Sequence, residues 1–311
     1  MLTFDKIKIV TYIQNIKDIN HNYFKTISQG DYIRGYRYSK KTPYTLIIDT
    51  NNEKGELVIE FTAKVLLDKY PKLINKDTIR ECFDNINRLD ICTLDTDAIL
   101  NASNVVKCDV TKDFDGNIKD IKNYIRQNLA NYRKWTAEYH QGSGGIIVKK
   151  TATTDAKRFV IYDKGSEMWR KTNAAFLSTL TDKERTLDYF KGKVRFEINS
   201  KSVAMTKKLL QIPTTDLADV LNATANPFKT ILDEALTQQT EVHPVKSLRD
   251  YERYLLLKEY DFDMEAVTEK VRSLISKNTS ITKSLEPYRQ LCQQMQPQPL
   301  SASDLRSTLT M

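Results

Sequence analysis

One tyrosine of this sequence lies between two cations of the same predicted strand. The stretch from Arg158 to Glu167, RFVIYDKGSE, is rich in β-branched and aromatic residues and reaches a glycine, which predicts a strand. Because side chains alternate along a strand, Arg158, Tyr162 and Lys164 would share one face. Cations beside a phenol favour its ionised form and attract phosphate. The stretch therefore predicts a nucleophilic tyrosine directed at phosphate, although Tyr162 alone also fits a half-buried sheet residue.

Four predicted strands place acidic, basic or phenolic groups on one face and apolar groups on the other. If these strands are neighbours, three carboxylates converge near Tyr162. Carboxylate oxygens are preferred ligands of Mg²⁺ and Mn²⁺, and such a cation would polarise a phosphodiester. The chemistry predicted is DNA strand cleavage by transesterification. The alternative is that Asp90 and Glu197 form ion pairs with Arg88 or Arg195. The polar positions are Glu60, Arg88, Asp90, Arg158, Tyr162, Lys164, Arg195 and Glu197.

The elements that must hold these residues can be read from hydrophobic periodicity. Strands are expected over residues 2–12 and 193–199 and over the polar stretch 87–95, with hairpins over residues 43–67 and 146–164. A helix follows residue 75. After residue 203 the pattern indicates helices alone, at about 203–210, 214–223, 226–238, 247–259, 263–276 and 280–295.

A helix of about 20 residues is expected over residues 117–138. Its apolar stripe should cover the sheet, and its opposite side is basic. That basic side is explained either as a solvated face or as a contact to DNA. The stripe is Ile118, Ile121, Ile125, Leu129 and Tyr132, and the basic side is Lys122, Arg126, Arg133 and Lys134.

Composition limits the classes of function. The 311 residues carry a net charge of +8, and residues 1–244 hold 38 Lys and Arg against 31 Asp and Glu. A basic main body suggests a polyanionic partner, most simply nucleic acid. The absence of a long apolar run argues against a membrane span. Four cysteines without ligand spacing indicate free thiols and a cytoplasmic location. Three widely separated histidines argue against a multi-histidine metal site.

Four segments, taken in order, resemble the replication initiator endonucleases of filamentous phages and the related rolling-circle plasmid initiators of the Rep_trans type. They are GELVIEFTAKVL, INRLDIC, RFVIYDKGSE and GKVRFEINSKS, within residues 55–225. The resemblance implies an α+β fold in which a central, mainly antiparallel sheet has helices on one face. This is the HUH-endonuclease architecture, here without the histidine pair, and a helical C-terminal region follows it.

The resemblance also implies roles for single residues. Tyr162 would be the nicking nucleophile and Lys164 a cation that contacts the phosphate. Asp90, with Glu60 and Glu197, would bind Mg²⁺ or Mn²⁺. Some plasmid initiators have a second acid four residues after the RxD aspartate, where this sequence has Leu94. The expected contacts to DNA come from Arg88, Arg158, Arg195, Arg126, Arg133 and Lys134.

The function expected is that of a rolling-circle initiator. It would nick one strand of a single-stranded or hairpin origin, forming a 5′-phosphotyrosyl intermediate and a 3′-OH primer, with a host helicase and polymerase as partners. Residues 1–225 would form the catalytic and origin-binding domain, 226–295 a helical region and 296–311 a disordered tail. Helices 263–276 and 280–295 outline a helix-turn-helix, although their neutral charge favours packing or a homodimer contact. The alternatives are a non-catalytic origin-binding or regulatory protein, and a mobilisation relaxase.

Overall fold

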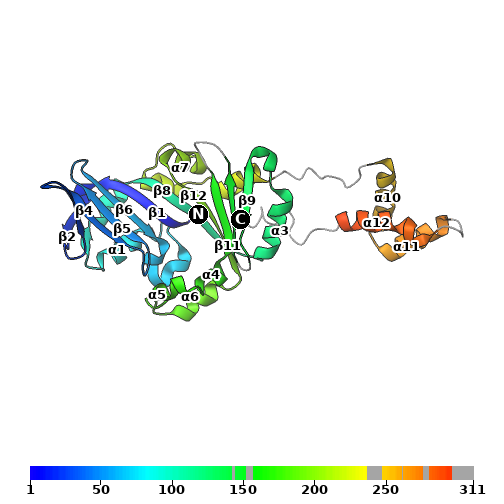
Figure 1. The fold of residues 1–311 in the computed structure, drawn as a ribbon, viewed down its shortest axis with the longest axis horizontal. Coiled ribbons are helices and arrows are strands. Elements are labelled where there is room, and N and C mark those ends of the chain that lie inside the picture. The colour runs from blue at the N-terminus through cyan, green and yellow to red at the C-terminus, as the bar shows by residue number, and fades with distance from the viewer. Residues whose placement is uncertain (142–143, 152–156, 237–246, 261, 276–279, 296–311) are drawn as a thin grey trace. The chain divides into compact units, whose positions relative to one another are not determined.

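The chain forms two units. The computed structural model describes all residues except 142–143, 152–156, 237–246, 261, 276–279 and 296–311 (Figure 1). The first unit spans Met1–Thr237 and the second Gln238–Leu305. The expected disordered tail, residues 296–311, lies outside the described residues.

The first unit is built on a ten-stranded sheet in which every neighbouring pair is antiparallel. The strand order is β3-β4-β5-β6-β1-β8-β12-β11-β10-β9, so the first strand lies in the middle. A small second sheet pairs β2 (Ile16–Ile19) with β7 (Cys92–Leu94). The ten strands are β1 (Phe4–Tyr12), β3 (Lys25–Gln29), β4 (Tyr32–Lys40), β5 (Leu46–Asn51), β6 (Glu56–Thr62), β8 (Asn104–Asp115), β9 (Trp135–Tyr139), β10 (Ile146–Lys150), β11 (Arg158–Asp163) and β12 (Lys193–Ser200).

One face of the sheet is apolar and carries helices. Phe61 of β6 packs edge-on against Phe83 of α1, and Phe196 of β12 packs against Phe228 of α9. Helices α3, α7 and α8 contact β11, β8 and β12. The α+β class and the large antiparallel sheet are as the sequence predicts. The helices of this unit are α1 (Ile79–Asn87), α2 (Thr96–Asn101), α3 (Ile118–Asn128), α4 (Lys164–Met168), α5 (Ala174–Leu177), α6 (Lys183–Phe190), α7 (Val203–Leu210), α8 (Leu217–Asn222) and α9 (Pro227–Ala235).

The opposite face of the sheet, here called the polar face, carries the hydrophilic side chains. The register places Asp113 beside Arg195 and Arg195 beside Tyr162 across β8, β12 and β11. The 3₁₀ segment η2 (Ala63–Lys72) contacts β1, and α4 contacts β11 and β12. Helix α6 contacts both η2 and α4. In Figure 1, α5 and α6 lie on the opposite side of the central strands from α7, so the expectation of helices on one face alone is wrong. Shorter 3₁₀ turns are η1 (Ile13–Asn15), η3 (Asn131–Arg133) and η4 (Lys171–Asn173).

Two predicted elements are wrong in part. The expected strand over residues 87–95 is the end of α1, a turn and the three-residue strand β7. Asp90 lies in that turn with a φ of 53°. The expected helix over residues 117–138 ends at Asn128, and Trp135 begins the edge strand β9. Ile118, Ile121 and Ile125 are buried as predicted, whereas Tyr132 is exposed.

The second unit contains α10 (Leu248–Glu259), α11 (Met264–Leu274) and α12 (Ile281–Met295). Its own buried cluster includes Leu257, Val267, Val271 and Leu285. The sequence correctly predicts this helical C-terminal region. Within the described residues of both units, no helix is both long and apolar enough to traverse a bilayer.

Candidate active site

Tyr162 and Glu197 form a hydrogen-bonded pair on the polar face. The phenolic hydroxyl of Tyr162 donates to Oε1 of Glu197 at 2.6 Å. Val160 is the register partner of Glu197, so Tyr162 lies diagonally across the β11–β12 pair from it. Both side chains are half-buried, which leaves part of each open to solvent. The predicted nucleophile therefore has a carboxylate within reach of its proton.

The protonation of this pair follows from burial. Burial, and then the charge of Glu197, raises the pKa of Tyr162 well above its ordinary value. Burial, and then the charge of Asp5, raises the pKa of Glu197 to about 7. Tyr162 is thus a neutral phenol in the free protein, contrary to the ionised phenol expected from adjacent cations. A carboxylate with a pKa near 7 can accept a proton at neutral pH.

The chain changes from strand to helix just after Tyr162. Asp163 caps α4 by accepting from Ser166 N at 2.8 Å, so Lys164 begins a helix and does not continue the strand. The Lys164 ammonium still lies 5.8 Å from the centre of the Tyr162 ring. At Gly145 a Cβ atom would lie 2.6 Å from Cβ of Tyr162, so only glycine fits there without moving β11.

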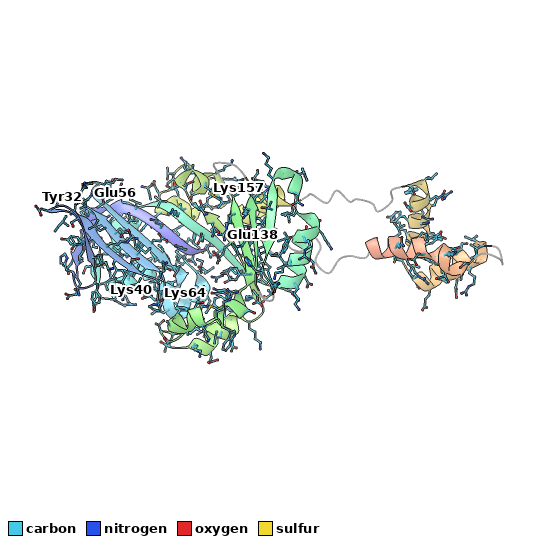
Figure 2. The ribbon with its side chains drawn as sticks, in the orientation of Figure 1. Tyr32, Lys40, Glu56, Lys64, Glu138 and Lys157 are labelled. Atoms are coloured by element: carbon cyan, nitrogen blue, oxygen red, sulfur yellow. The ribbon has the colours of Figure 1, made fainter. Side chains whose placement is uncertain are left out.

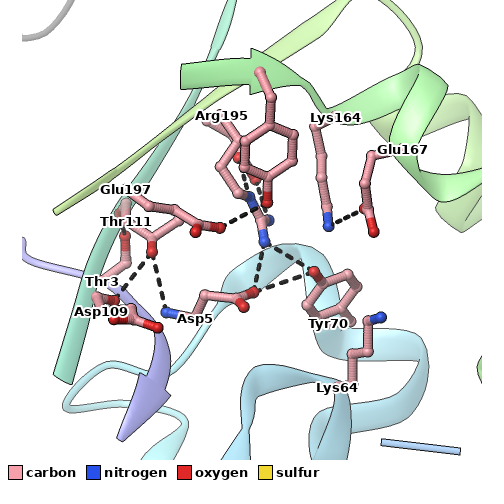
Figure 3. Close-up of polar contacts among 12 residues, drawn as sticks. Thr3, Asp5, Lys64, Tyr70, Asp109, Thr111, Lys164, Glu167, Arg195 and Glu197 are labelled. Atoms are coloured by element: carbon pink, nitrogen blue, oxygen red, sulfur yellow. Dashed lines mark hydrogen bonds and ion pairs between the residues drawn. The ribbon is translucent and has the colours of Figure 1, made fainter. Parts of the chain in front are cut away.

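Two lysines and an acid form a network beside the pair. Lys164 is almost fully buried and donates to Oε2 of Glu167 at 2.6 Å. Asn173 donates to the other Glu167 oxygen at 2.9 Å and accepts from Lys64 Nζ at 2.6 Å. Burial opposes ionisation of Glu167, but Lys164 and then Asn173 outweigh it and lower its pKa to about 2. Figure 3 shows Lys164 directed at Glu167, with Lys64 beside Tyr70.

Arg195 is fully buried at the centre of this region (Figure 3). Its Nε and Nη2 donate to the two carboxylate oxygens of Asp113 at 2.6 and 2.8 Å. Its Nη1 donates to Asp5 at 2.5 Å and to the Tyr70 hydroxyl at 2.8 Å. The expected DNA contact by Arg195 is therefore wrong, because its side chain is fully buried and its donors are occupied by Asp113, Asp5 and Tyr70. The guanidinium instead joins β12, β8, β1 and η2.

Arg158, by contrast, lies on the polar face as the sequence predicts. Its Nη1 donates to Asn199 Oδ1 at 2.5 Å, and Asn199 donates to Asp109 Oδ1 at 2.8 Å. Burial raises the pKa of Asp109, with a further contribution from the charge of Asp5. Both Arg158 and Asp109 are half-buried. They form a second polar cluster alongside the Tyr162–Glu197 pair.

The three predicted metal ligands do not come together. Asp90 is exposed in the turn after α1, outside the ten-stranded sheet. Glu60 lies on β6 and is ion-paired with Lys6 and, at 3.6 Å, with Lys8. Only Glu197 is beside Tyr162. Within the residues that the structure describes, no three His, Cys, Asp or Glu side chains are grouped as a metal site.

Two acids that the sequence does not predict as site residues, Asp5 and Asp109, lie near Glu197. Asp5 is on β1 and Asp109 on β8, the two strands that follow β12 in the sheet order. The register pairs Asp109 with Asn199 on β12, and Lys6 with Asp109 on the other side. The available signal was the charged pattern FDKIK and VKCDVTKDFD, in which acids recur on consecutive strands.

The other predicted DNA contacts lie away from this cluster. Arg88 is exposed at the end of α1 and donates to Asn85 at 2.7 Å. Arg126 packs over the ring of Tyr139, and Arg133 packs over that of Tyr132. Arg126, Arg133 and Lys134 are exposed, which fits either explanation given for the basic side of the predicted helix.

All four cysteines are buried and unpaired, as their spacing predicts. Comparison of the sequence with models of known protein families and with curated proteins finds no match.

Proposed function

We propose that this protein is a rolling-circle DNA replication initiator that nicks one strand through Tyr162. The observation that carries the proposal is the 2.6 Å hydrogen bond from the Tyr162 hydroxyl to Glu197 on a partly open, cation-flanked sheet face. The resemblance of the four sequence segments supplies the replication role and the 5′ polarity. We further infer a variant of the HUH-endonuclease architecture without histidines.

In the proposed reaction, the Tyr162 oxygen attacks the scissile phosphorus while Glu197 accepts the phenolic proton. The bond from phosphorus to the 3′ oxygen breaks, and that oxygen leaves as a 3′-OH after taking up a proton. The 5′ phosphate is then esterified to Tyr162. The reverse step rejoins the strand, because one phosphodiester has been exchanged for another. Lys164 and Lys64 supply positive charge near the phosphate oxygens.

Mg²⁺ or Mn²⁺ is part of the proposal, but its ligands are assigned differently from the sequence expectation. Asp5 and Asp109 face the same side of adjacent strands, and the charge of Asp5 contributes to the raised pKa of Asp109. Despite burial, Arg195 and the nearby lysines lower the pKa of Asp5 and keep it ionised, and an ionised carboxylate next to Asp109 suits a hard cation. When bound, it would act as a Lewis acid on the phosphodiester. Glu197 keeps the role of base.

The edge hairpin, formed by β3 and β4, is the surface proposed to hold origin DNA. Residues 20–44 contain five Lys and Arg against one Asp. Tyr23 and Tyr32 are each 53% exposed, and Figure 2 shows Tyr32 at the outer end of the sheet. Lys25, Lys40 and Lys41 have no ion pair within the described residues. Exposed cations interleaved with tyrosines favour phosphate contact and base stacking.

The test is a nicking assay with a supercoiled plasmid that carries the protein's own replicon. Wild type and Tyr162→Phe are compared in Mg²⁺, Mn²⁺ or EDTA. The proposal expects metal-dependent nicking and a covalent protein–DNA adduct, both lost in the variant. Nicking that survives Tyr162→Phe would move the chemistry to another residue or to water. Binding without nicking in any metal would favour a non-catalytic origin-binding protein.

A further inference from the structure

A cavity of about 690 Å³ adjoins the candidate active site. Its wall includes Thr3, the outer end of β8 and the loop between α8 and α9, with η2 and α6 completing it. Thr111 and Asp113 of this wall are the register partners of Glu197 and Arg195 on β12. Figure 3 shows Thr3 and Thr111 next to Asp5. The cavity is therefore one strand away from the Tyr162–Glu197 pair.

The charge of the cavity is positive. Lys72, Lys76 and Lys112 line it, and Asp113 is the one acid among its described lining residues. Both oxygens of that acid are occupied by Arg195, which neutralises its charge. Lys112 is half-buried and has no ion pair or side-chain hydrogen bond within the described residues. Burial lowers the pKa of Lys112, because the charged ammonium is partly removed from water. An anion bound beside it would offset this desolvation cost.

The remaining lining suits a planar, hydrogen-bonding group. Tyr189 is 40% exposed and lines the cavity, with Lys193 Nζ 5.7 Å from the centre of its ring. Asn222, Thr224 and Asn226 also line the cavity, where Asn222 Oδ1, the Thr224 hydroxyl and Asn226 Nδ2 are the polar atoms not used in the helix hydrogen bonds of Asn222 and Asn226. Volumes of about 300–1,000 Å³ are typical of sites for small organic ligands. An aromatic ring, a few polar groups and nearby lysines are the combination that binds a base together with its phosphate.

We propose that this cavity binds one nucleotide of the single-stranded substrate, next to the nucleotide whose phosphate is attacked. Lys112 and Lys72 contact its phosphate and Tyr189 stacks on its base. This inference rests on the proposed function, because it identifies the substrate of the same site as an unpaired strand. A free mononucleotide has the same chemistry, and the experiment separates the two sources.

The experiment measures binding in the full-length Tyr162→Phe protein, so that cleavage does not intervene. A fluorescent single-stranded oligonucleotide of the origin is titrated by anisotropy. Lys112→Met and Tyr189→Ala are each expected to raise Kd about tenfold. The matched controls Lys119→Met and Tyr251→Ala remove an exposed lysine and an exposed tyrosine outside the cavity and should change Kd less than twofold. Lys112→Gln keeps a polar side chain of similar length and should also raise Kd. A thermal melt of each variant tests whether a rise in Kd reflects unfolding.

A second arm moves an abasic site along the oligonucleotide. One position should weaken binding in the Tyr162→Phe protein and have no further effect when Tyr189→Ala is added. Equal Kd values for the cavity variants and their controls would overturn the proposal. Competition by deoxyadenosine monophosphate, with no effect of the variants on the oligonucleotide, would assign the cavity to free nucleotides and also overturn it. If the wild-type protein shows no nicking while Lys112→Met and Tyr189→Ala still raise Kd, the proposed function alone would be overturned.

Discussion

Tyr162 donates its phenolic proton to Glu197 across the diagonal of the β11–β12 pair, at 2.6 Å. The two residues are 35 positions apart in the chain, and α4, α5 and α6 lie between them. The pair is open enough to meet a substrate and buried enough to perturb both pKa values. Its chemistry yields the first prediction.

Glu197→Gln should lower the rate of covalent adduct formation by about 10²–10⁴, because the base that takes the Tyr162 proton is lost. In wild type the rate should rise with pH through about 7, where Glu197 loses its own proton, and then level off. Glu138→Gln on β9 is the control and should retain wild-type rates. Quench-flow gels of the adduct measure both effects. A pH profile shared by wild type and Glu197→Gln would contradict the role of base.

Arg195→Met should lower the free energy of unfolding by about 3–5 kcal/mol, because the buried Asp113 and the half-buried Asp5 would lose their cation. Urea unfolding followed by circular dichroism measures it. Arg133→Met, at an exposed position, should stay within about 0.5 kcal/mol of wild type. Unchanged stability combined with weak DNA binding would restore the DNA contact that the sequence suggested for Arg195.

Asp90→Asn and Asp109→Asn separate the ligand expected from the sequence from the one favoured by the fold. Asp109→Asn should abolish metal-dependent nicking or raise the Mn²⁺ concentration needed for half-maximal rate by at least tenfold. Asp90→Asn should leave the nicking rate and the Mn²⁺ concentration for half-maximal rate within about twofold of wild type. Asp90 is exposed and lies outside the ten-stranded sheet. The reverse result would return the metal site to the RLD segment.

Glu167 should make stability depend on acid pH. Its pKa of about 2 in the folded protein lies below the ordinary 4.5, so its ionised form stabilises the fold. That contribution is complete above about pH 5 and is lost as the pH falls towards 2. The difference in unfolding free energy between wild type and Glu167→Gln should therefore shrink by on the order of 2 kcal/mol over this range. Glu53→Gln, at an exposed position, is the control for the loss of a carboxylate.

The double variant Lys25→Gln/Lys40→Gln should weaken DNA binding and reduce its salt dependence. Each lost phosphate contact lowers the slope of log K against log salt by about 0.7 to 0.9. Anisotropy titrations at salt concentrations from roughly 50 to 200 mM measure this slope. Lys258→Gln/Lys270→Gln in the second unit is the control of equal charge. An unchanged slope would exclude the edge hairpin as a DNA surface.

The sequence predicted the strands that carry Tyr162 and Glu197, because their apolar and polar residues alternate without interruption. It missed β8, where Lys112 lies on the otherwise apolar side next to the cavity and breaks the alternation. It also missed Asp5, since a bulge between Phe4 and Lys6 changes the register there. A pattern with period two does not record a bulge.

The error over Asp90 has a different origin. Residues 88–90, RLD, alternate as strand residues would, but α1 runs to Asn87 and its end is followed directly by a turn. Alternation over only three residues fits a strand and equally fits the turn that follows a helix. The burial of Cys82, Phe83 and Ile86, with Phe83 packed edge-on against Phe61 of β6, fixes α1 and so places RLD in the turn after it. Long periodic segments were thus predictable, whereas short motifs next to an element boundary were not.

The ion pair between Arg195 and Asp5 joins residues 190 positions apart in the chain. Since β1 lies mid-sheet between β6 and β8, its second edge stays unpaired until β8 is synthesised, and β12 must follow before Arg195 can dock. Contacts of such long sequence separation form late in folding and slowly. A nascent chain that has not yet reached β12 has neither Glu197 nor Arg195, so a prematurely terminated product carries Tyr162 without its partner base. The proposed strand cleavage would thus become possible only once the last strand of the sheet, β12, is made.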